Sequence, residues 1–408
     1  MSLNRLVNVG LRALTLLSKF SLIFFLALFL EARDVALYGL FTATVSYSIY
    51  CIGFNFYSFS TRELLSHESS KWVSFLRDQG VFFFSSYLVV VPFFSIVFLT
   101  GLLPWELAMW FCLLVVSEHL SQELSRLYVA VSKQLIASFI LFFRSGFWAL
   151  AVSLIMWSQP QFRSLESILF AWVCGSVFAC FLGLSYFRLF DWRYLKAAVD
   201  WGWIRRGIKV ALPLLIANLA IRGIFTIDRY WVQAVSDEEI LAVYVFFSAV
   251  AVSVVSFLEA GVFVYLYPRI IASFKEARMH DFYSSVRSLL LQTFTVASFL
   301  CVTLVLASNL FLSYLNDMYS ENLDVLYVLL VSIFVYSLSM VPHYALYAMS
   351  RDKEIIFSNV AGVVAFSLFA YFFSFLSNSL RVPVALCAAF SVVLIIKFLL
   401  YYKNQKDY

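Results

Sequence analysis

The chain has 408 residues, of which 63% are hydrophobic, 19% aromatic and 13% charged. Soluble domains carry about 25% charged residues, so this composition excludes a soluble protein, and we expect no nucleic-acid partner. The net charge of +5 is informative only through its distribution. The apolar runs are about 20 residues long, which favours membrane-spanning helices over the roughly 10-residue strands of a barrel. We therefore predict an all-α polytopic membrane protein.

The first apolar run, residues 11–30, follows the basic residues Arg5 and Arg12. It is too long for the apolar region of a secretory signal, and Leu30-Glu31-Ala32 is no cleavage site of small residues, so we expect a retained span. Eleven further apolar runs follow it along the chain. The twelve predicted spans are 11–30, 36–60, 80–101, 105–131, 134–157, 165–187, 208–233, 239–267, 288–312, 323–349, 354–376 and 382–402.

Basic residues alternate between the loops that join these spans. With a cytoplasmic N-terminus, most Lys and Arg residues fall on the cytoplasmic side, including Lys397 at the end of the last span, whereas the opposite loops hold Arg33, Arg163 and Arg381. Cytoplasmic loops are enriched in Lys and Arg in membrane proteins. The sequence therefore predicts a multi-pass protein with both termini in the cytoplasm.

The second half of the sequence repeats parts of the first. Residues 36–43 (ALYGLFTA) align with 242–249 (AVYVFFSA), and 130–133 (AVSK) align with 348–351 (AMSR). A segment that interleaves Trp and Tyr with Arg and Lys, suited to the headgroup region, separates the two halves. We predict two parallel six-helix halves, 1–188 and 208–408, joined by an interfacial amphipathic linker, 189–207, around a central cavity.

Four basic residues are left inside predicted spans after the others are assigned to the two sides, and a charge there is costly unless it faces protein or water. These candidate substrate-binding residues are Lys19, Arg144, Arg222 and Arg229. Arg144 and Arg222 cannot easily reach an interface, so we interpret them as lining the cavity. Lys19 and Arg229 could instead extend their long side chains along their own helices to the membrane surface.

Four acidic residues inside or near the ends of spans are candidates for ion coupling or gating. They are Glu118, Glu123, Asp228 and Glu259. Structural roles compete with coupling for two of them. Asp228 could neutralise Arg229 or bridge to another helix, and we favour such structural pairing over ion coupling. Glu123 could pair with Arg126 along the same helix.

The sequence contains no pattern typical of a metal, catalytic or cofactor site. All 6 cysteines lie in apolar runs without the spacing of metal ligands, and the 4 histidines are scattered. The loops between spans have no room for a folded soluble domain. We therefore expect no metal, no cofactor and no enzymatic activity.

Three stretches of the sequence resemble the polysaccharide-type flippases of the multidrug/oligosaccharidyl-lipid/polysaccharide exporter superfamily, in which O-antigen translocases are a branch. The resemblance covers nearly the whole chain, with short signals at Pro213, Asp228-Arg229, Tyr244 and Pro268-Arg269. The three stretches are LYGLFTATVSYSIYCIGFNFYSFSTREL, SEHLSQELSRLYVAVSKQ, and the segment from IKVALPLLIANLAIRGIFTIDRYWV to LAVYVFFSAVAVSVVSFLEAGVFVYLYPRI.

This resemblance implies a flippase that moves a polyprenyl-pyrophosphate-linked oligosaccharide, an O-antigen unit or related surface polysaccharide, across a bacterial inner membrane by alternating access. Its partners would be the lipid-linked glycan, the bilayer and other polysaccharide assembly proteins. Arginine suits the pyrophosphate, because its guanidinium forms paired hydrogen bonds with phosphate oxygens.

Three alternatives stay open. A cation-coupled drug or small-molecule exporter of the same superfamily would have a cavity dominated by carboxylates. Lipid II translocation also needs a cationic cavity, but that branch typically has more than twelve spans. A membrane polysaccharide polymerase is disfavoured by the short loops.

Overall fold

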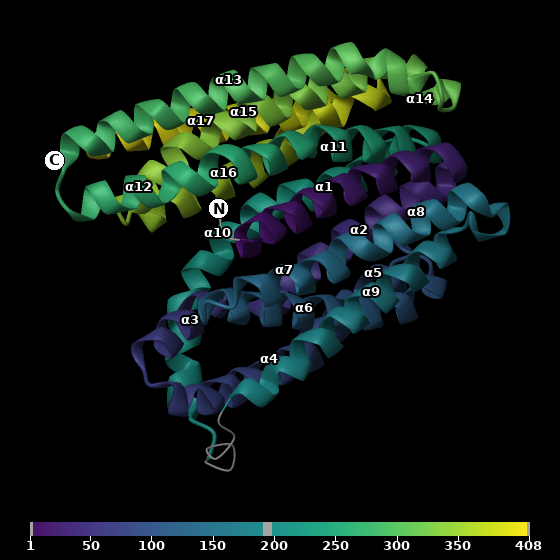
Figure 1. Cartoon of the computed structure of the whole chain (residues 1–408). Helices are drawn as coiled ribbons and strands as arrows, with labels where there is room; N and C mark the ends of the chain where they lie inside the picture. Colours follow the sequence, from purple (N-terminus) through teal and green to yellow (C-terminus); the bar gives the residue numbers. More distant parts are fainter. Residues whose placement is uncertain (1–2, 191–197, 406–408) are drawn as a thin grey trace. The chain divides into compact units, whose positions relative to one another are not determined.

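The computed structural model describes residues 3–190 and 198–405, and within these ranges the chain is helical and contains no strand (Figure 1). This confirms the predicted all-α class. The chain divides into two compact units. Unit 1 comprises Met1–Leu30 and Leu40–Leu215, and unit 2 comprises Glu31–Gly39 and Ile216–Tyr408.

In unit 1, the helix α6 packs against α9 and α7, and α1 packs against α7 and α8. The helices α2 and α10 each contribute to both units. The helices of unit 1 are α1 (Leu3–Phe29), most of α2 (Ala32–Gly53), α3 (Tyr57–Ser66), α4 (Trp72–Phe94), α5 (Ile96–Leu99), α6 (Ala108–Ala130), α7 (Gln134–Phe142), α8 (Trp148–Ser158), α9 (Leu165–Ser185) and the first part of α10 (Trp201–Val235).

In unit 2, α15 packs along α17 and contacts α11 and α13, and Figure 1 shows α13, α15 and α17 running side by side. A short helix, α14, lies in the connection between α13 and α15. Besides the rest of α10, the helices of unit 2 are α11 (Glu238–Leu258), α12 (Val264–Lys275), α13 (Met279–Leu312), α14 (Asp317–Glu321), α15 (Leu323–Ala348), α16 (Asp352–Phe372) and α17 (Asn378–Gln405).

Within the described residues, 11 helices are long and apolar enough to cross a membrane. Two of them, Gln134–Ser158 and Glu238–Lys275, each join two α-helices through one π-helical turn. The predicted span 105–131 corresponds to α6, whose 23 residues extend about 34 Å, enough to cross a hydrocarbon core about 30 Å thick. Helix α6 is not one of these 11 apolar helices, because it carries several charged side chains. With α6, the structure accounts for all twelve predicted spans.

The predicted span 36–60 is wrong at its C-terminal end. Helix α2 stops at Gly53, and Phe54 and Asn55 adopt φ angles of 51° and 55° before α3 begins at Tyr57. Residues other than glycine rarely adopt the left-handed region, so this break carries a conformational cost that the packing must offset. Gly53 is the one sign of this break in the sequence, because the residues after it remain largely apolar.

The predicted linker 189–207 is only partly described, since residues 191–197 lie outside the described ranges. Its last part forms the first turns of α10, where Trp203 is 1% exposed and packs against Phe56 and Phe59 within unit 1. A Cβ atom added at Gly207 would lie 2.4 Å from the Phe56 ring. The start of α10 is therefore fixed in the core of unit 1 by close aromatic packing.

The two aligned segments AVSK and AMSR form the same turn, one in each unit. Ser132 and Ser350 have φ angles of 61° and 58° and follow the ends of α6 and α15. The backbone N–H of Lys133 donates to the Tyr128 carbonyl at 2.7 Å, and that of Arg351 donates to the Leu346 carbonyl at 2.9 Å. Both turns are Schellman motifs, built on serine where glycine is usual.

Candidate functional site

The polar interior of unit 1 is organised around α6. This helix carries Glu118, His119 and Glu123, which are 6%, 1% and 8% exposed. Burying such groups is costly unless hydrogen bonds or opposite charges compensate. Each has partners on helices other than α6, so the three residues form a column of polar contacts inside the unit.

Glu118 lies at the centre of this column. Its Oε2 atom is 3.5 Å from Nη1 of Arg144, and its Oε1 atom accepts a hydrogen bond of 2.7 Å from the indole Nε1 of Trp172. Lys19, about midway along α1, interacts electrostatically with both Glu118 and Arg144, and its side chain is exposed on the surface of unit 1. The structure thus brings together Lys19, Arg144 and Glu118, which the sequence placed on three different spans.

Arg144 owes its position to an irregular helix. It lies in the π-helical turn Phe143–Phe147 between α7 and α8. Such a turn widens the helix by one residue, and π-turns are frequent at functional sites. Trp148 donates its indole N–H to the Arg144 carbonyl at 2.7 Å, which satisfies one backbone acceptor at this turn.

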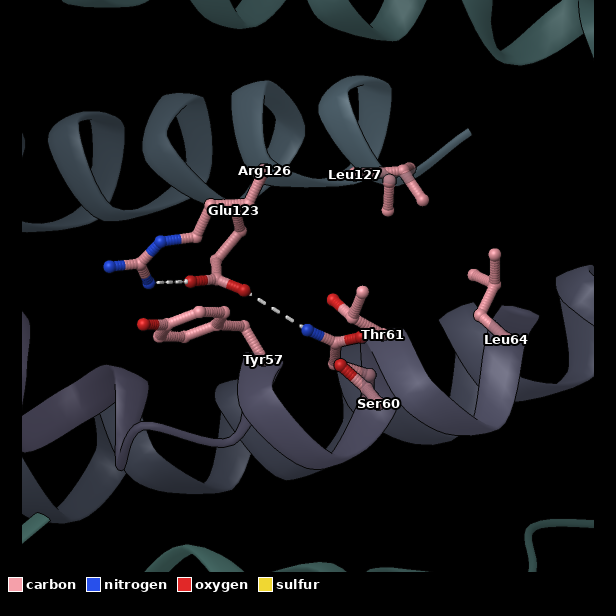
Figure 2. A pocket seen from close by; sticks show the side chains of 9 residues that line it. Tyr57, Ser60, Thr61, Leu64, Glu123, Arg126 and Leu127 are labelled. Carbon is pink, nitrogen blue, oxygen red and sulfur yellow. Dashed lines mark hydrogen bonds and ion pairs between the residues drawn. The ribbon is translucent and has the colours of Figure 1, made fainter. Parts of the chain in front are cut away.

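Glu123 forms a second group, nearer the end of α6. Arg126 Nη1 donates to Glu123 Oε1 at 2.5 Å, and Gln79 Nε2 donates to Oε2 at 3.1 Å. Figure 2 shows Arg126 and Glu123 above Tyr57, whose ring centroid is 3.9 Å from the guanidinium carbon of Arg126. A pocket of about 20 Å³ borders these residues, enough room for one water molecule. The Glu123–Arg126 pair along one helix, considered from the sequence, is therefore present.

His119, which follows Glu118 on α6, was not selected from the sequence. Its Nδ1 atom lies 2.7 Å from the Tyr87 hydroxyl, and its Nε2 atom has no hydrogen-bond partner among the described residues. A Cβ atom at Gly53 would approach Nε2 to 3.1 Å, so Gly53 leaves space for the ring. One histidine in an apolar run gave no signal of this contact.

In unit 2, Asp228 interacts with both Arg229 and Tyr244. The Tyr244 hydroxyl donates to Asp228 Oδ2 at 2.7 Å, and the backbone N–H of Arg229 donates to Oδ1 at 2.7 Å. The Arg229 guanidinium donates instead to the Phe225 carbonyl at 2.8 Å. Asp228, which is 2% exposed, thus links α10 to α11 through Tyr244. Both structural roles considered from the sequence are therefore present, since Asp228 also interacts electrostatically with Arg229.

Glu259 and Arg222 interact electrostatically on unit 2, and both side chains are exposed there. Glu259 begins the second π-helical turn of the described chain, Glu259–Phe263. A charged side chain near the middle of a span needs water or protein around it. Both π-turns therefore carry a charged residue that the sequence singled out.

Unit 2 also contains a buried cation that was not among the candidate site residues. Lys397, which the sequence groups with the basic residues of the cytoplasmic side, is 1% exposed and lies inside α17. It interacts electrostatically with His343 on α15, whose Nδ1 atom has no hydrogen-bond partner among the described residues. The sequence did contain a sign of this burial, because Lys397 falls within the predicted span 382–402.

Comparison with known proteins reveals the fold. No protein-family model and no curated protein matches the sequence. A solved multidrug resistance MATE family transporter of the MOP superfamily, in an inward-facing conformation, matches with a TM-score of 0.70 and 12% identity over 98% of this chain and 97% of its own. The chain has the fold of the MATE transporters.

Two further MATE structures match over nearly the full chain. An outward-facing multidrug resistance MATE transporter has a TM-score of 0.65 and 12% identity, covering 99% of this chain and 94% of its own. A MATE transporter from Vibrio cholerae has a TM-score of 0.61 and 10% identity, covering 98% of both chains. The solved structures do not single out the polysaccharide branch of the superfamily.

Proposed function

We propose that this protein is a membrane transporter that works by alternating access. The MATE fold supports this proposal, and it matches solved MATE transporters in both inward-facing and outward-facing conformations. Alternating access exposes one binding site to each side of the membrane in turn, so the two states are the ones such a cycle requires.

As cargo we propose a small organic molecule, exported in exchange for a cation. The solved relatives in fold are described as multidrug resistance transporters, which favours the exporter considered as an alternative from the sequence. The observation that carries this proposal is the buried carboxylate of Glu118, held between Arg144 and Trp172. A buried carboxylate beside a cationic side chain can bind and release a proton or a metal cation when the distance between the two groups changes.

A second cargo is supported by a different observation. The basic residues Lys19, Arg144 and Arg222 occupy the middle of spans, and Lys19 and Arg222 are exposed on their units. Cations in such positions suit an anionic cargo, and Arg suits phosphate in particular. A lipid-linked oligosaccharide pyrophosphate, the cargo implied by the sequence resemblance, satisfies this requirement.

One set of variants separates the two cargoes. Glu118→Gln, Arg144→Gln and Arg222→Gln are expressed in a drug-sensitive strain and in a strain lacking its own polysaccharide flippase. If the protein exports drugs, the wild type lowers drug accumulation and Glu118→Gln abolishes this effect at an unchanged protein level.

If the protein moves a glycan, the wild type restores surface polysaccharide, and the two arginine variants lose it when polysaccharide is compared per amount of protein in the membrane. A wild type that changes neither drug accumulation nor polysaccharide contradicts both cargoes. Normal polysaccharide in both arginine variants contradicts the role of these cations.

A further inference from the structure

Unit 2 contains a groove apart from the charged residues discussed above. It lies between α13, α15 and α17 and has a volume of about 240 Å³. A single water needs only about 10–15 Å³ by this measure, whereas drug-sized ligands occupy about 300–1,000 Å³. The groove is therefore too small for a whole drug-sized ligand but large enough for part of a long, narrow molecule.

The groove opens beside exposed apolar side chains of unit 2. Phe398, which lines the groove, is 39% exposed, and Leu291 and Phe294 on the adjacent part of α13 are 57% and 53% exposed. Pro342 of α15 borders the groove, and a proline inside a helix cannot donate a hydrogen bond to the carbonyl of the preceding turn. In a membrane, the molecules that reach such a face are lipids.

The two ends of the groove differ in chemistry. Leu290, Val341 and Phe398 supply apolar walls, whereas Arg287 and Tyr283 belong to the first turns of α13. Gln405, the last residue of α17, borders the groove as well, so its polar end lies at one end of the helices. An apolar slot with a cation at the membrane surface matches an acyl chain attached to a phosphate.

Arg287 is available for such a ligand. Its side chain is exposed, and within the described residues no carboxylate lies within ion-pair distance of it. Arg278, nine positions earlier, differs in this respect because it pairs with Glu276 at 2.7 Å and Asp281 at 2.9 Å. Arg278 is therefore a suitable control for Arg287, because it lies outside the groove and its charge is already neutralised.

We propose that this groove is a binding site for an anionic glycerophospholipid, with an acyl chain along Leu290, Val341 and Phe398 and the phosphate group at Arg287. Lipid tails are as apolar in the bilayer as in the groove, so the headgroup supplies the selectivity. A cation near the membrane surface favours an anionic lipid roughly fivefold.

The test uses the full chain in nanodiscs made of equal parts phosphatidylglycerol and phosphatidylcholine. Native mass spectrometry then measures the lipids that stay bound after release from the disc. The wild type is expected to retain phosphatidylglycerol about fivefold over phosphatidylcholine. Arg287→Gln loses this preference, Arg287→Lys keeps most of it, and the control Arg278→Gln behaves as the wild type.

Filling the groove tests the acyl chain independently of the charge. Leu290→Trp is expected to lose the retained lipid of both kinds, while its melting temperature shows that it is folded. The proposal is overturned if Arg287→Gln keeps the preference, if Arg278→Gln loses it equally, or if the wild type retains no lipid and instead forms dimers. If Leu290→Trp does not fold, the comparison between Arg287→Gln and Arg287→Lys still decides.

Discussion

Glu118 is the residue at which the charged side chains of unit 1 converge. The sequence placed Glu118 and Arg144 inside spans, because charges are rare there, but it could not show that they pair. Their contact depends on the rotation of each helix about its own axis. The π-turn at Phe143–Phe147 shifts the rotation of the residues after it relative to a regular α-helix, so helical periodicity does not predict where they point.

Removing one partner of this pair should be costlier than removing both. Arg144→Gln leaves the Glu118 carboxylate buried with only Trp172 and Lys19 nearby, and we expect a loss of about 3–5 kcal/mol in stability. The double variant Arg144→Gln/Glu118→Gln should regain most of that loss, because no buried charge remains unpaired. Thermal unfolding of the four proteins in detergent measures the cycle, and additive losses would contradict the pairing.

The partner of Asp228 could not be predicted from neighbouring positions alone. Arg229 is adjacent in sequence, but consecutive residues of a helix point in different directions. Tyr244 reaches the carboxylate from α11 and accounts for its burial. The tyrosine had been noted as one of the short signals of the sequence resemblance, without any assigned contact.

At the scale of elements, one close contact joins α2 to α11 within unit 2. A Cβ atom added at Gly39 would lie 2.1 Å from a methyl group of Val245. These two residues occupy equivalent positions in the internal repeat, which aligns 36–43 with 242–249. The absence of a side chain at Gly39 is therefore what allows the two helices to approach.

Gly39→Ala should destabilise the protein by about 1–3 kcal/mol, the usual cost of overpacking. Val245→Ala in the same chain should recover most of the loss by making room for the new methyl group. Gly80→Ala in α4 is the matched control, because no atom lies within 4 Å of its added Cβ, and it should cause no loss. Melting temperatures in detergent decide between these outcomes, and an equal loss in both glycine variants would rule out the packing argument.

Sequence periodicity predicted which stretches form spans better than where they end. Helices α1, α10 and α13 begin before the predicted spans, because their first turns are polar or amphipathic and do not raise the apolar content. The stop after α2 depends on two residues with positive φ, neither of which is glycine. Such a break is set by tertiary packing and is not encoded in local composition.

For the whole molecule, the distribution of basic residues predicts how the chain crosses the membrane. Helix α13 lies between Lys275, in a basic stretch, and Asp317, in an acidic one. Its 34 residues extend about 51 Å, long enough to place the two positions on opposite sides of a bilayer. The positive-inside rule assigns Lys275 to the cytoplasm.

Single cysteines at these positions test the orientation in a background without the 6 native cysteines. A thiol reagent that cannot cross the membrane should label Asp317→Cys in intact spheroplasts. Lys275→Cys should react only after the membrane is permeabilised. The opposite pattern would reverse the orientation of both termini.

The two π-helical turns also affect how such a protein can change. Each turn holds one more residue than a regular turn, so deletion of a single codon there would restore an ordinary helix. Because the wide turn already absorbs the extra residue, the helix on either side of the deletion would keep nearly the same rotation. Deletion or insertion of a single codon can therefore remove or restore the present position of Arg144 or Glu259. The amino acids on either side need not change.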